Sequence, residues 1–466
     1  MKYIYNICIY IYWLGIFIAS WFNNKAKLFI KGRESLIKRV ENEVKSGDDI
    51  TWIHCSSVGE FEQARPVIEK IKKENNSKIL LTFFSPSGYE LRKNYNLADW
   101  VYYMPLDTRK NAKAFIKAIN PKRAIFVKYE FWYNHLYELK RNNIDIYIIS
   151  AIFRPGQIFF KWYGFFFRKM LHLFTILFVQ DERSKQLLEG IGITNNVIIG
   201  GDTRFDRVNE IASKSKDLPI IESFAKEHFT LVAGSSWEPD ELMLAKTLKN
   251  FSKAKLILVP HEIGSDRIKK ILQIFSEYKI IKYTDILSEY QNISNVDNAN
   301  TTISATNINS TASANSSANA TIAANTSCSA NTNSIANASC INNTINDAIN
   351  NANVIIIDTI GMLSSIYKYG NCAYIGGGFG VGIHNILEAA TYGIPVIFGP
   401  NYYKFKEAKD LLKIGGAYSV KNDSEFYEIF TDLIKNRSLL ESKGQICRKY
   451  VESNLGATNK IYQKIF

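Results

Sequence analysis

The segment from Tyr374 to Pro400 reads YIGGGFGVGIHNILEAATYGIPVIFGP, and it is the most informative stretch of this chain. Its apolar start predicts a buried strand, and the glycines that follow predict a tight loop that opens a helix at His384 and Asn385. Gly393 ends that helix before a second apolar strand. A strand, a loop, a helix and a further strand in this order are typical of an open parallel sheet covered by helices.

The same loop predicts an anion site. Backbone amides in a glycine loop and at a helix N-terminus point toward a bound anion, and the helix dipole favours negative charge there. Glu388, one turn inside the helix, could accept hydrogen bonds from sugar or ribose hydroxyls. The glycines could instead serve only a tight connection, because the dinucleotide fingerprint spacing is not matched. The added His384, Asn385 and Glu388 favour a nucleotide-sugar site.

Short apolar runs alternate with amphipathic stretches along most of the chain, a pattern typical of doubly wound α/β domains. The first series comprises residues 78–84, 100–104, 123–127, 144–150, 176–180 and 196–199. A second series, after Pro219, comprises residues 229–233, 255–259, 354–357, 373–375 and 394–398. With 466 residues the chain can form two cores. We expect two Rossmann-like domains, 25–212 and 213–466, that face one another across a cleft.

The N-terminus predicts a membrane anchor over residues 1–24. Residues Ile4 to Phe22 form an almost unbroken apolar run, just long enough to span a bilayer as a helix, with Asn6 as its only strongly polar member. The run lacks a clear cleavage site, which disfavours a signal peptide. Several cations follow it, whereas only Lys2 precedes it. The positive-inside rule therefore predicts that the bulk of the chain lies in the cytoplasm.

The net charge and the cysteine spacing indicate which kinds of binding partner and which cellular compartment suit this chain. The formal net charge of +13 suits an anionic membrane surface or an anionic substrate. Nucleic acid is disfavoured, since the chain shows no recognised binding module. The six cysteines are scattered without paired metal spacing, which predicts reduced thiols in the cytosol.

A segment from 291 to 353 consists almost entirely of Asn, Ala, Ser, Thr and Ile. It has too little large apolar surface to offset its ordering entropy, so we expect disorder. A tolerated surface-loop insertion and an interaction tail both fit this composition.

A second candidate site lies at His54–Phe61, between the first strand and the first helix of the N-terminal domain. Gly59 would let the backbone approach a ligand, and Glu60 would lie at the mouth of the interdomain cleft, where open α/β sheets bind ligands. Transfer of a sugar to a hydroxyl needs a base, and a cleft carboxylate can act as one. Glu60 could also serve only to stabilise the helix N-terminus through its dipole.

Five motifs in register resemble those of the 3-deoxy-D-manno-octulosonic acid (Kdo) transferases, which glycosylate lipid A precursor in lipopolysaccharide synthesis. They are Ser57–Glu60, Lys128–Trp132, Gly201–Asp206, Asp358–Gly361, and Gly376-Gly377 with His384-Asn385-x-x-Glu388. The resemblance covers nearly the whole chain except the Asn-rich segment. It implies an inverting GT-B glycosyltransferase of the inner membrane, with the acceptor lipid IVA bound by the first domain and the donor CMP-Kdo by the second.

The resemblance also implies roles for individual residues. Glu60 would be the catalytic base, and Ser57, Gly59 and Glu130 would lie on the acceptor side, although Glu130 could equally pack around Trp132. The donor residues implied are Arg204, Pro260, His261, Gly361, Gly377, Gly378, His384, Asn385 and Glu388. Arg204 could instead form a surface ion pair with Asp206. No metal or other cofactor is expected, since no Asp-x-Asp motif is present to hold a divalent ion.

One departure concerns the donor phosphate. Many family members carry Pro-Arg-His after the second strand of the donor domain, whereas this chain reads Val259-Pro260-His261-Glu262. Arg267 is a candidate replacement cation or a solvated helix residue.

Residues Ile158 to Leu171 mix aromatic side chains with Lys161, Arg168 and Lys169. This composition suits a segment in the lipid headgroup layer or a buried core helix. Two other functions stay open at this point: a different membrane-associated GT-B transferase that uses a nucleoside-diphosphate sugar, and an inactive scaffold of the same fold.

Overall fold

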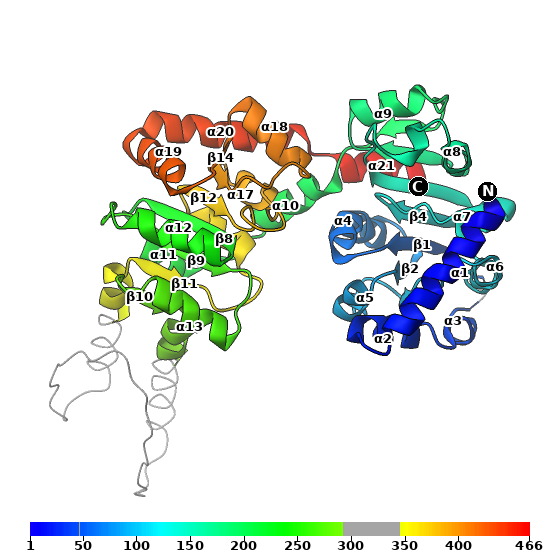
Figure 1. The fold of residues 1–466 in the computed structure, drawn as a ribbon, viewed down its shortest axis with the longest axis horizontal. Helices are drawn as coiled ribbons and strands as arrows, with labels where there is room; N and C mark the ends of the chain where they lie inside the picture. Colours follow the sequence, from blue (N-terminus) through cyan, green and yellow to red (C-terminus); the bar gives the residue numbers. More distant parts are fainter. Residues whose placement is uncertain (46, 292–344) are drawn as a thin grey trace, which may run out of the picture. The chain divides into compact units, whose positions relative to one another are not determined.

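The computed structural model describes residues 1–45, 47–291 and 345–466. These residues form two compact units, one of residues 1–210 with 451–466 and one of residues 211–450 (Figure 1). The boundary lies two residues from the predicted one. The assignment of all of 213–466 to the second domain was wrong, because the last sixteen residues belong to the first unit.

Helix α21 (Ala457–Ile465) explains this return of the chain. Its residues Ile461 and Ile465 are buried in the core of the first unit, against helix α4 (Val58–Glu74). Asp206 accepts hydrogen bonds from the amides of Gly456 and Thr458, each at 2.7 Å. The carboxylate thus satisfies donors at the start of α21, where orphan amides need partners.

The described part of the first unit contains a parallel sheet of order β3-β2-β1-β4-β5-β6-β7. The strands are β1 (Ile50–Cys55), β2 (Lys78–Phe83), β3 (Trp100–Tyr103), β4 (Arg123–Val127), β5 (Asp145–Ala151), β6 (Ile176–Val179) and β7 (Val197–Ile199). Besides α4 and α21, the covering helices include α5 (Pro86–Arg92), α6 (Arg109–Ile119), α7 (Tyr133–Arg141) and α9 (Glu182–Glu189). Helix α10 (Thr203–Ser213) contains the boundary between the two units. Every residue of β1 is buried, as expected for a central strand covered on both faces.

Alternate residues of the central strands enter different cores. Trp52 opposes Leu80 and belongs with it to the core on one face of the sheet. The next pair, Ile53 and Leu81, belongs to the core on the other face. The one-residue register therefore fixes which side chains reach each layer.

The second unit has a parallel sheet of order β10-β11-β9-β8-β12-β13-β14 within its described residues. Its strands are β8 (Thr230–Ser236), β9 (Lys255–Pro260), β10 (Ile280–Lys282), β11 (Val354–Ile356), β12 (Cys372–Ile375), β13 (Val396–Phe398) and β14 (Ala417–Ser419). Its helices include α11 (Pro219–Ala225), α12 (Glu238–Leu248), α13 (Ser265–Ile274), α16 (Leu363–Ile366), α17 (Leu387–Ala390), α18 (Lys406–Ile414), α19 (Asp423–Lys435) and α20 (Arg437–Ser453). Two Rossmann-like units are therefore confirmed, and the two short edge strands β10 and β14 are additions to the prediction.

The predicted disordered segment 291–353 falls mainly outside the described residues, which omit 292–344. Residues 345–351, however, are helical, and Ile345 and Ile349 are buried. The carbonyl of Asn350 accepts a 2.9 Å hydrogen bond from the ammonium of Lys255. The prediction was wrong for this end, because isoleucines four residues apart provide an apolar stripe for a helix.

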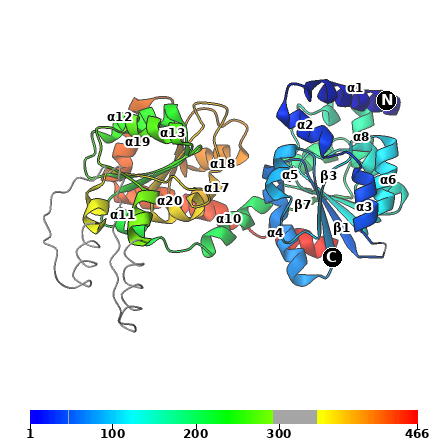
Figure 2. The same ribbon diagram turned by 90° about the horizontal axis from the view of Figure 1, so that it is seen from below.

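Helix α1 (Lys2–Ala19) is the one helix among the described residues that is long and apolar enough to cross a bilayer. It packs along the first unit together with α2 (Asn24–Lys31) and near α3 (Leu36–Glu43) (Figure 2). The less exposed side of α1 carries Tyr5, Ile9 and Ile16, and the ring of Tyr12 stacks on Phe84. This spacing of three to four residues places them on one face of the helix.

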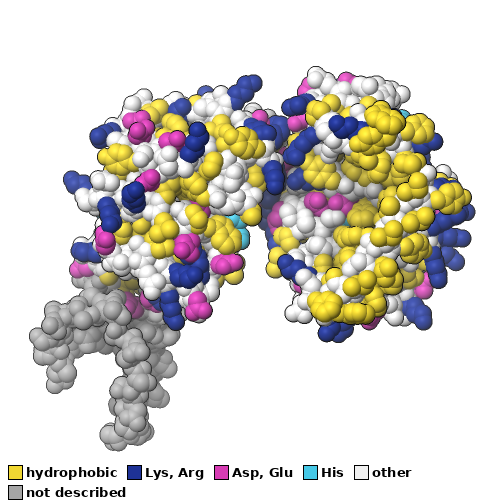
Figure 3. Space-filling model, viewed as in Figure 1, with side chains coloured by type: hydrophobic (Ala, Val, Ile, Leu, Met, Phe, Trp, Pro, Cys, Tyr) yellow, Lys and Arg dark blue, Asp and Glu magenta, His cyan; other side chains and the backbone are white. Residues whose placement is uncertain are grey.

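The opposite face of α1 is apolar and exposed. Its large side chains are Tyr3, Ile4, Ile7, Tyr10, Ile11, Leu14, Phe17 and Ile18, followed by Trp21 and Phe22. Figure 3 shows hydrophobic side chains as a continuous band where Figure 1 draws α1.

Candidate functional site

Glu60 lies at the carboxyl edge of the first sheet, as predicted. Helix α4 starts directly after β1, with Ser57 as its N-cap. Oε2 of Glu60 accepts hydrogen bonds from the amides of Ser56 at 2.6 Å and Ser57 at 3.2 Å. The carboxylate thus caps the helix, as the structural alternative predicted. Among the described residues, Oε1 has no hydrogen-bond partner, so one oxygen of this half-buried carboxylate is available for chemistry.

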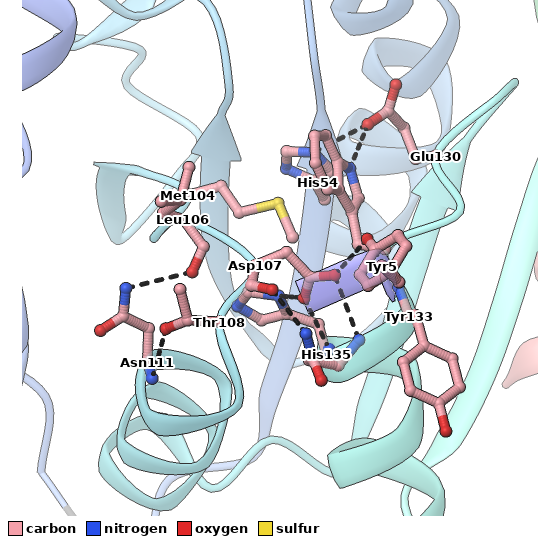
Figure 4. A network of polar contacts seen from close by, with 12 residues as sticks. Tyr5, His54, Met104, Leu106, Asp107, Thr108, Asn111, Glu130, Tyr133 and His135 are labelled. Atoms are coloured by element: carbon pink, nitrogen blue, oxygen red, sulfur yellow. Dashed lines mark hydrogen bonds and ion pairs between the residues drawn. The ribbon is translucent and has the colours of Figure 1, made fainter. Parts of the chain in front are cut away.

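Glu130 is held beside this site by two donors. Nε2 of His54 lies 3.1 Å from its Oε2, and Nε1 of Trp132 donates to the same oxygen at 2.5 Å (Figure 4). Glu130 is only 6% exposed. The contact between Glu130 and Trp132 is confirmed, and the role of Glu130 on the acceptor side stays a prediction. Lys128, two residues earlier, has a left-handed φ of 68°, a strained conformation that recurs at functional sites.

A chain of buried polar groups leads to Glu130. Oγ1 of Thr82 accepts a 2.9 Å hydrogen bond from Nε1 of Trp52 and lies 2.9 Å from Nδ1 of His54. If the threonine hydroxyl donates to Nδ1, then Nε2 carries the histidine proton and donates it to Glu130; the network assigns this tautomer. Sequence reasoning missed Trp52 and Thr82. The available signal was a polar threonine within an otherwise apolar buried strand.

The two carboxylates have opposite proton affinities. Burial and the nearby Glu130 raise the pKa of Glu60 to about 7, against the opposing effects of the Ser56 amide and Lys128. Burial alone would also raise the pKa of Glu130, but the hydrogen bond and charge of His54 lower it overall. Glu130 therefore holds the negative charge, and Glu60 exchanges its proton near neutral pH, as suits a general base.

In the second candidate site, which lies in the segment 374–400, the helix after the glycine loop starts later than predicted. Helix α17 starts at Leu387, not at His384, and spans only four residues. Asn385 precedes it: its Oδ1 accepts from the Leu387 amide at 3.2 Å, and its Nδ2 donates to Oε1 of Glu388 at 2.9 Å. The helix starts late because the preceding loop bonds elsewhere, with the His384 amide donating to the carbonyl of Gly376.

The glycine loop is bonded to, and packed closely against, other residues of its own unit to a greater extent than predicted. The Gly376 amide donates to Gly234, and the Gly377 amide donates to Oδ2 of Asp240 at 3.0 Å. A Cβ at Gly376 would lie 2.2 Å from the Ser235 carbonyl oxygen, and one at Gly378 would lie 2.6 Å from the Gly399 backbone. The prediction that this loop aims its amides at an anion was wrong for Gly376 and Gly377, because the unit itself uses those donors.

Three rings stack beside this loop. The ring centroids of Trp237 and His261 are 4.7 Å apart, and those of His261 and His384 are 4.5 Å apart. Nε1 of Trp237 also donates to Nε2 of His384 at 3.3 Å. Burial and His261 lower the pKa of His384, which favours the neutral ring that this hydrogen bond requires. Sequence reasoning predicted both histidines but missed Trp237.

Both candidate arginines have carboxylate partners. Arg267 pairs with the fully buried Glu241, which also accepts from Ser236. Arg204 lies in the first unit and pairs with Asp202 at 2.7 Å, not with Asp206 as the structural alternative proposed.

The remaining predicted residues lie at the ends of elements. Gly59 is exposed in the first turn of α4, and Pro260 is buried at the end of β9. Gly361 is exposed after β11, with a φ of 91° that only glycine adopts easily.

Comparison with known proteins identifies a family. Residues 30–207 match the family model described as 3-deoxy-D-manno-octulosonic-acid transferase (kdotransferase). The 3-deoxy-D-manno-octulosonic acid transferase of Aquifex aeolicus is 25% identical over 87% of this chain and 92% of its own length. The transferase of the same name from Chlamydia trachomatis serovar D is 23% identical over 90% of this chain and 86% of its own.

Among solved structures, the UDP-GlcNAc 2-epimerase of Neisseria meningitidis bound to UDP-GlcNAc superposes with a TM-score of 0.56 at 15% identity. The superposition covers 89% of this chain and 98% of the epimerase. At this identity the likeness shows the GT-B fold alone. The match of the first unit, together with relatives aligned over most of both units, makes the chain a member of the Kdo transferase family of glycosyltransferases.

Proposed function

We propose that the protein transfers Kdo from CMP-Kdo to the lipid A precursor lipid IVA, with inversion at the anomeric carbon. Family membership supports the reaction class. The observation that carries the proposal is the carboxylate of Glu60, which has one oxygen without a hydrogen-bond partner in the described part of the chain and a pKa raised to about 7 by burial and Glu130. Such a group accepts a proton readily at neutral pH without being permanently protonated.

In this reaction an acceptor hydroxyl attacks the anomeric carbon as Oε1 of Glu60 takes its proton. The bond between that carbon and the phosphate oxygen breaks, and CMP leaves with the electron pair. Glu130 keeps its negative charge through His54 and Trp132, which maintains the proton affinity of Glu60.

For the donor we propose the second unit. The exposed face of the ring stack at His261 offers a flat surface for a base or sugar, and aromatic faces favour such contacts. Glu388, oriented by Asn385, would accept ribose hydroxyls. Since the amides of Gly376 and Gly377 are engaged, the ring nitrogens of His261 and His384 are better placed to donate hydrogen bonds to the phosphate.

We also propose that the protein is bound to the cytoplasmic face of the inner membrane. The exposed apolar face of α1 and the net charge of +13 favour an anionic lipid surface. Because Tyr5 and Asn6 hydrogen-bond to the first unit, α1 is better suited to lie in the membrane interface than to cross the bilayer.

Release of CMP from CMP-Kdo in the presence of lipid IVA tests the activity. We expect release that depends on both substrates. Transfer from a nucleoside-diphosphate sugar instead would indicate a different GT-B activity, and no turnover with any donor would indicate a scaffold.

A further inference from the structure

The first unit contains a cavity of about 450 Å³ beneath α1. Tyr10 and Trp13 of α1 form one side, Phe29 of α2 and Ile37 of α3 form another, and Leu106 after β3 contributes to the floor. A cavity of this volume is in the range of small-ligand sites. Tyr10 and Trp13 are also 56% and 40% exposed, so the cavity opens beside the apolar outer face of α1.

The cavity has a cation in its wall. The guanidinium of Arg33 donates to the carbonyls of Met104 at 2.9 Å and Phe84 at 2.8 Å, and it lies 3.6 Å from the ring centroid of Phe29. Burial lowers the pKa of Arg33 to about 9, so it stays charged near neutral pH. Across residues 1–45, 47–291 and 345–466, no carboxylate forms an ion pair with Arg33.

Two further charged residues line the cavity, and both are exposed. Lys110 lies in the first turn of α6, and Glu34 follows α2. With Arg33 the lining therefore carries two cations and one anion. An apolar wall with an excess of positive charge suits a ligand that has an apolar chain and an anionic head.

A buried polar network fixes helix α1, which forms one side of the cavity, to the rest of the first unit. The hydroxyl of Tyr5 donates to Oδ2 of the fully buried Asp107 at 2.5 Å, and Oδ1 of Asp107 contacts Nδ1 of His135 at 2.5 Å (Figure 4). Nδ2 of Asn134 donates to Oδ1 of Asn6 at 2.9 Å. Because these contacts fix the N-terminal part of α1 to the unit, the cavity is bounded by ordered structure rather than by a loose terminus.

We propose that this cavity binds an acyl chain of an anionic membrane lipid, with the chain between α1, α2 and α3 and the head near Arg33 and Lys110. The inference rests on the membrane placement proposed above for α1 and not on the Kdo chemistry. Two sources share this ligand chemistry: the lipid acceptor and an ordinary anionic phospholipid.

Aromatic contacts connect the cavity to the catalytic carboxylates. Arg33 lies 5.1 Å from the ring centroid of Phe84, and the Phe84 ring lies 4.6 Å from that of Trp132. Trp132 in turn donates to Glu130. Two ring contacts and one hydrogen bond thus connect Arg33 in the cavity wall to Glu130, which favours the acceptor as the occupant.

Binding of a dansyl-labelled fatty acid to the full chain tests the proposal, with energy transfer from tryptophan to dansyl as the readout. Ile37→Trp should fill the cavity and weaken binding at least about tenfold, the effect of excluding roughly two methylene groups. Leu28→Trp is the matched control, because Leu28 is exposed on α2 and does not line the cavity. Lys110→Ser should weaken binding less, and Lys113→Ser, on the same helix but outside the cavity, should not.

Each variant is first compared with the wild type for melting temperature and CMP binding, so that misfolding is recognised. Displacement of the probe by lipid IVA but not by phosphatidylglycerol identifies the acceptor as the source, and displacement by both identifies membrane lipid in general. Equal probe affinity in the wild type, Ile37→Trp and Lys110→Ser would overturn the proposal. Since the probe needs no sugar donor, the result stands whether or not Kdo is transferred.

Discussion

Glu60 and Asp240 occupy equivalent positions in the two units but have different environments. Each is the third residue of the helix that follows the first strand of its sheet, and each accepts a hydrogen bond from the backbone amide of its N-cap residue, Ser57 or Trp237. Asp240 is 1% exposed and also accepts from Tyr374 at 2.7 Å and Gly377 at 3.0 Å. Glu60 has one oxygen that no described residue contacts by a hydrogen bond, and it lies near a second carboxylate, Glu130.

The comparison shows that the same local motif can serve chemistry or architecture. Burial raises the pKa of both carboxyl groups. The donors around Asp240 fill both oxygens and join α12 to the glycine loop, which makes it a structural residue. Glu60 lacks such saturation, so its proton can move.

Removal of the Glu60 carboxylate should have the largest effect. Glu60→Gln should lower transfer about 10²–10⁴-fold, because the amide can still accept from the Ser56 and Ser57 amides but cannot take the proton. The measurement is the initial rate of CMP release at saturating CMP-Kdo. Glu62→Gln on the same helix is the control, since that side chain makes partly exposed ion pairs. If Glu60→Gln keeps more than half of the wild-type turnover, Glu60 only caps helix α4 and is not the catalytic base.

Asp240→Ala should instead lower stability. The change leaves the Tyr374 hydroxyl and the Gly377 and Trp237 amides without their acceptor, at about 1–3 kcal/mol for each buried donor that stays unsatisfied. Urea unfolding of the purified wild type and Asp240→Ala variant measures the decrease in the free energy of unfolding. Asp266→Ala, in the first turn of α13 with an exposed side chain, should change stability little. If Asp240→Ala unfolds at the same urea concentration as the wild type, the structural role proposed for Asp240 is wrong.

Glu388→Ala should weaken CMP binding roughly ten- to a hundredfold, since a hydrogen bond to a charged group is worth roughly 1.5–3 kcal/mol. Calorimetric titration with CMP measures this without the lipid, and Glu428→Ala, exposed on α19, is the control. If both variants bind CMP like the wild type, Glu388 does not belong to the nucleotide site.

The smallest change concerns pH. Transfer requires deprotonated Glu60, so its rate should rise as pH rises through about 7. Glu130→Gln removes the neighbouring charge and should move this rise to lower pH, though not as far as the ordinary value of 4.5, because burial remains. The dependence of kcat/KM on pH reports the shift. An unchanged profile would show that Glu130 does not set the proton affinity of Glu60.

Local patterns predicted the elements of this fold well. The alternation of apolar runs with amphipathic stretches predicted the strands of both sheets except the short edge strands β10 and β14, since side-chain periodicity and turn residues act over a few neighbouring residues. The placement of Glu60 at a sheet edge followed from one strand and one helix. Helix α17 was misplaced because its start depends on bonds from the preceding loop to Gly376 and Asn401, which no local pattern encodes.

The sequence by itself determined two α/β units, an apolar N-terminal helix and the family to which the chain belongs. Only the tertiary structure decided that α21 completes the first unit, that α1 packs on that unit, and that Glu130 lies close enough to raise the pKa of Glu60. The physical reason is that an element forms from its own neighbouring residues, whereas burial and charge around a side chain are sums over segments distant in sequence.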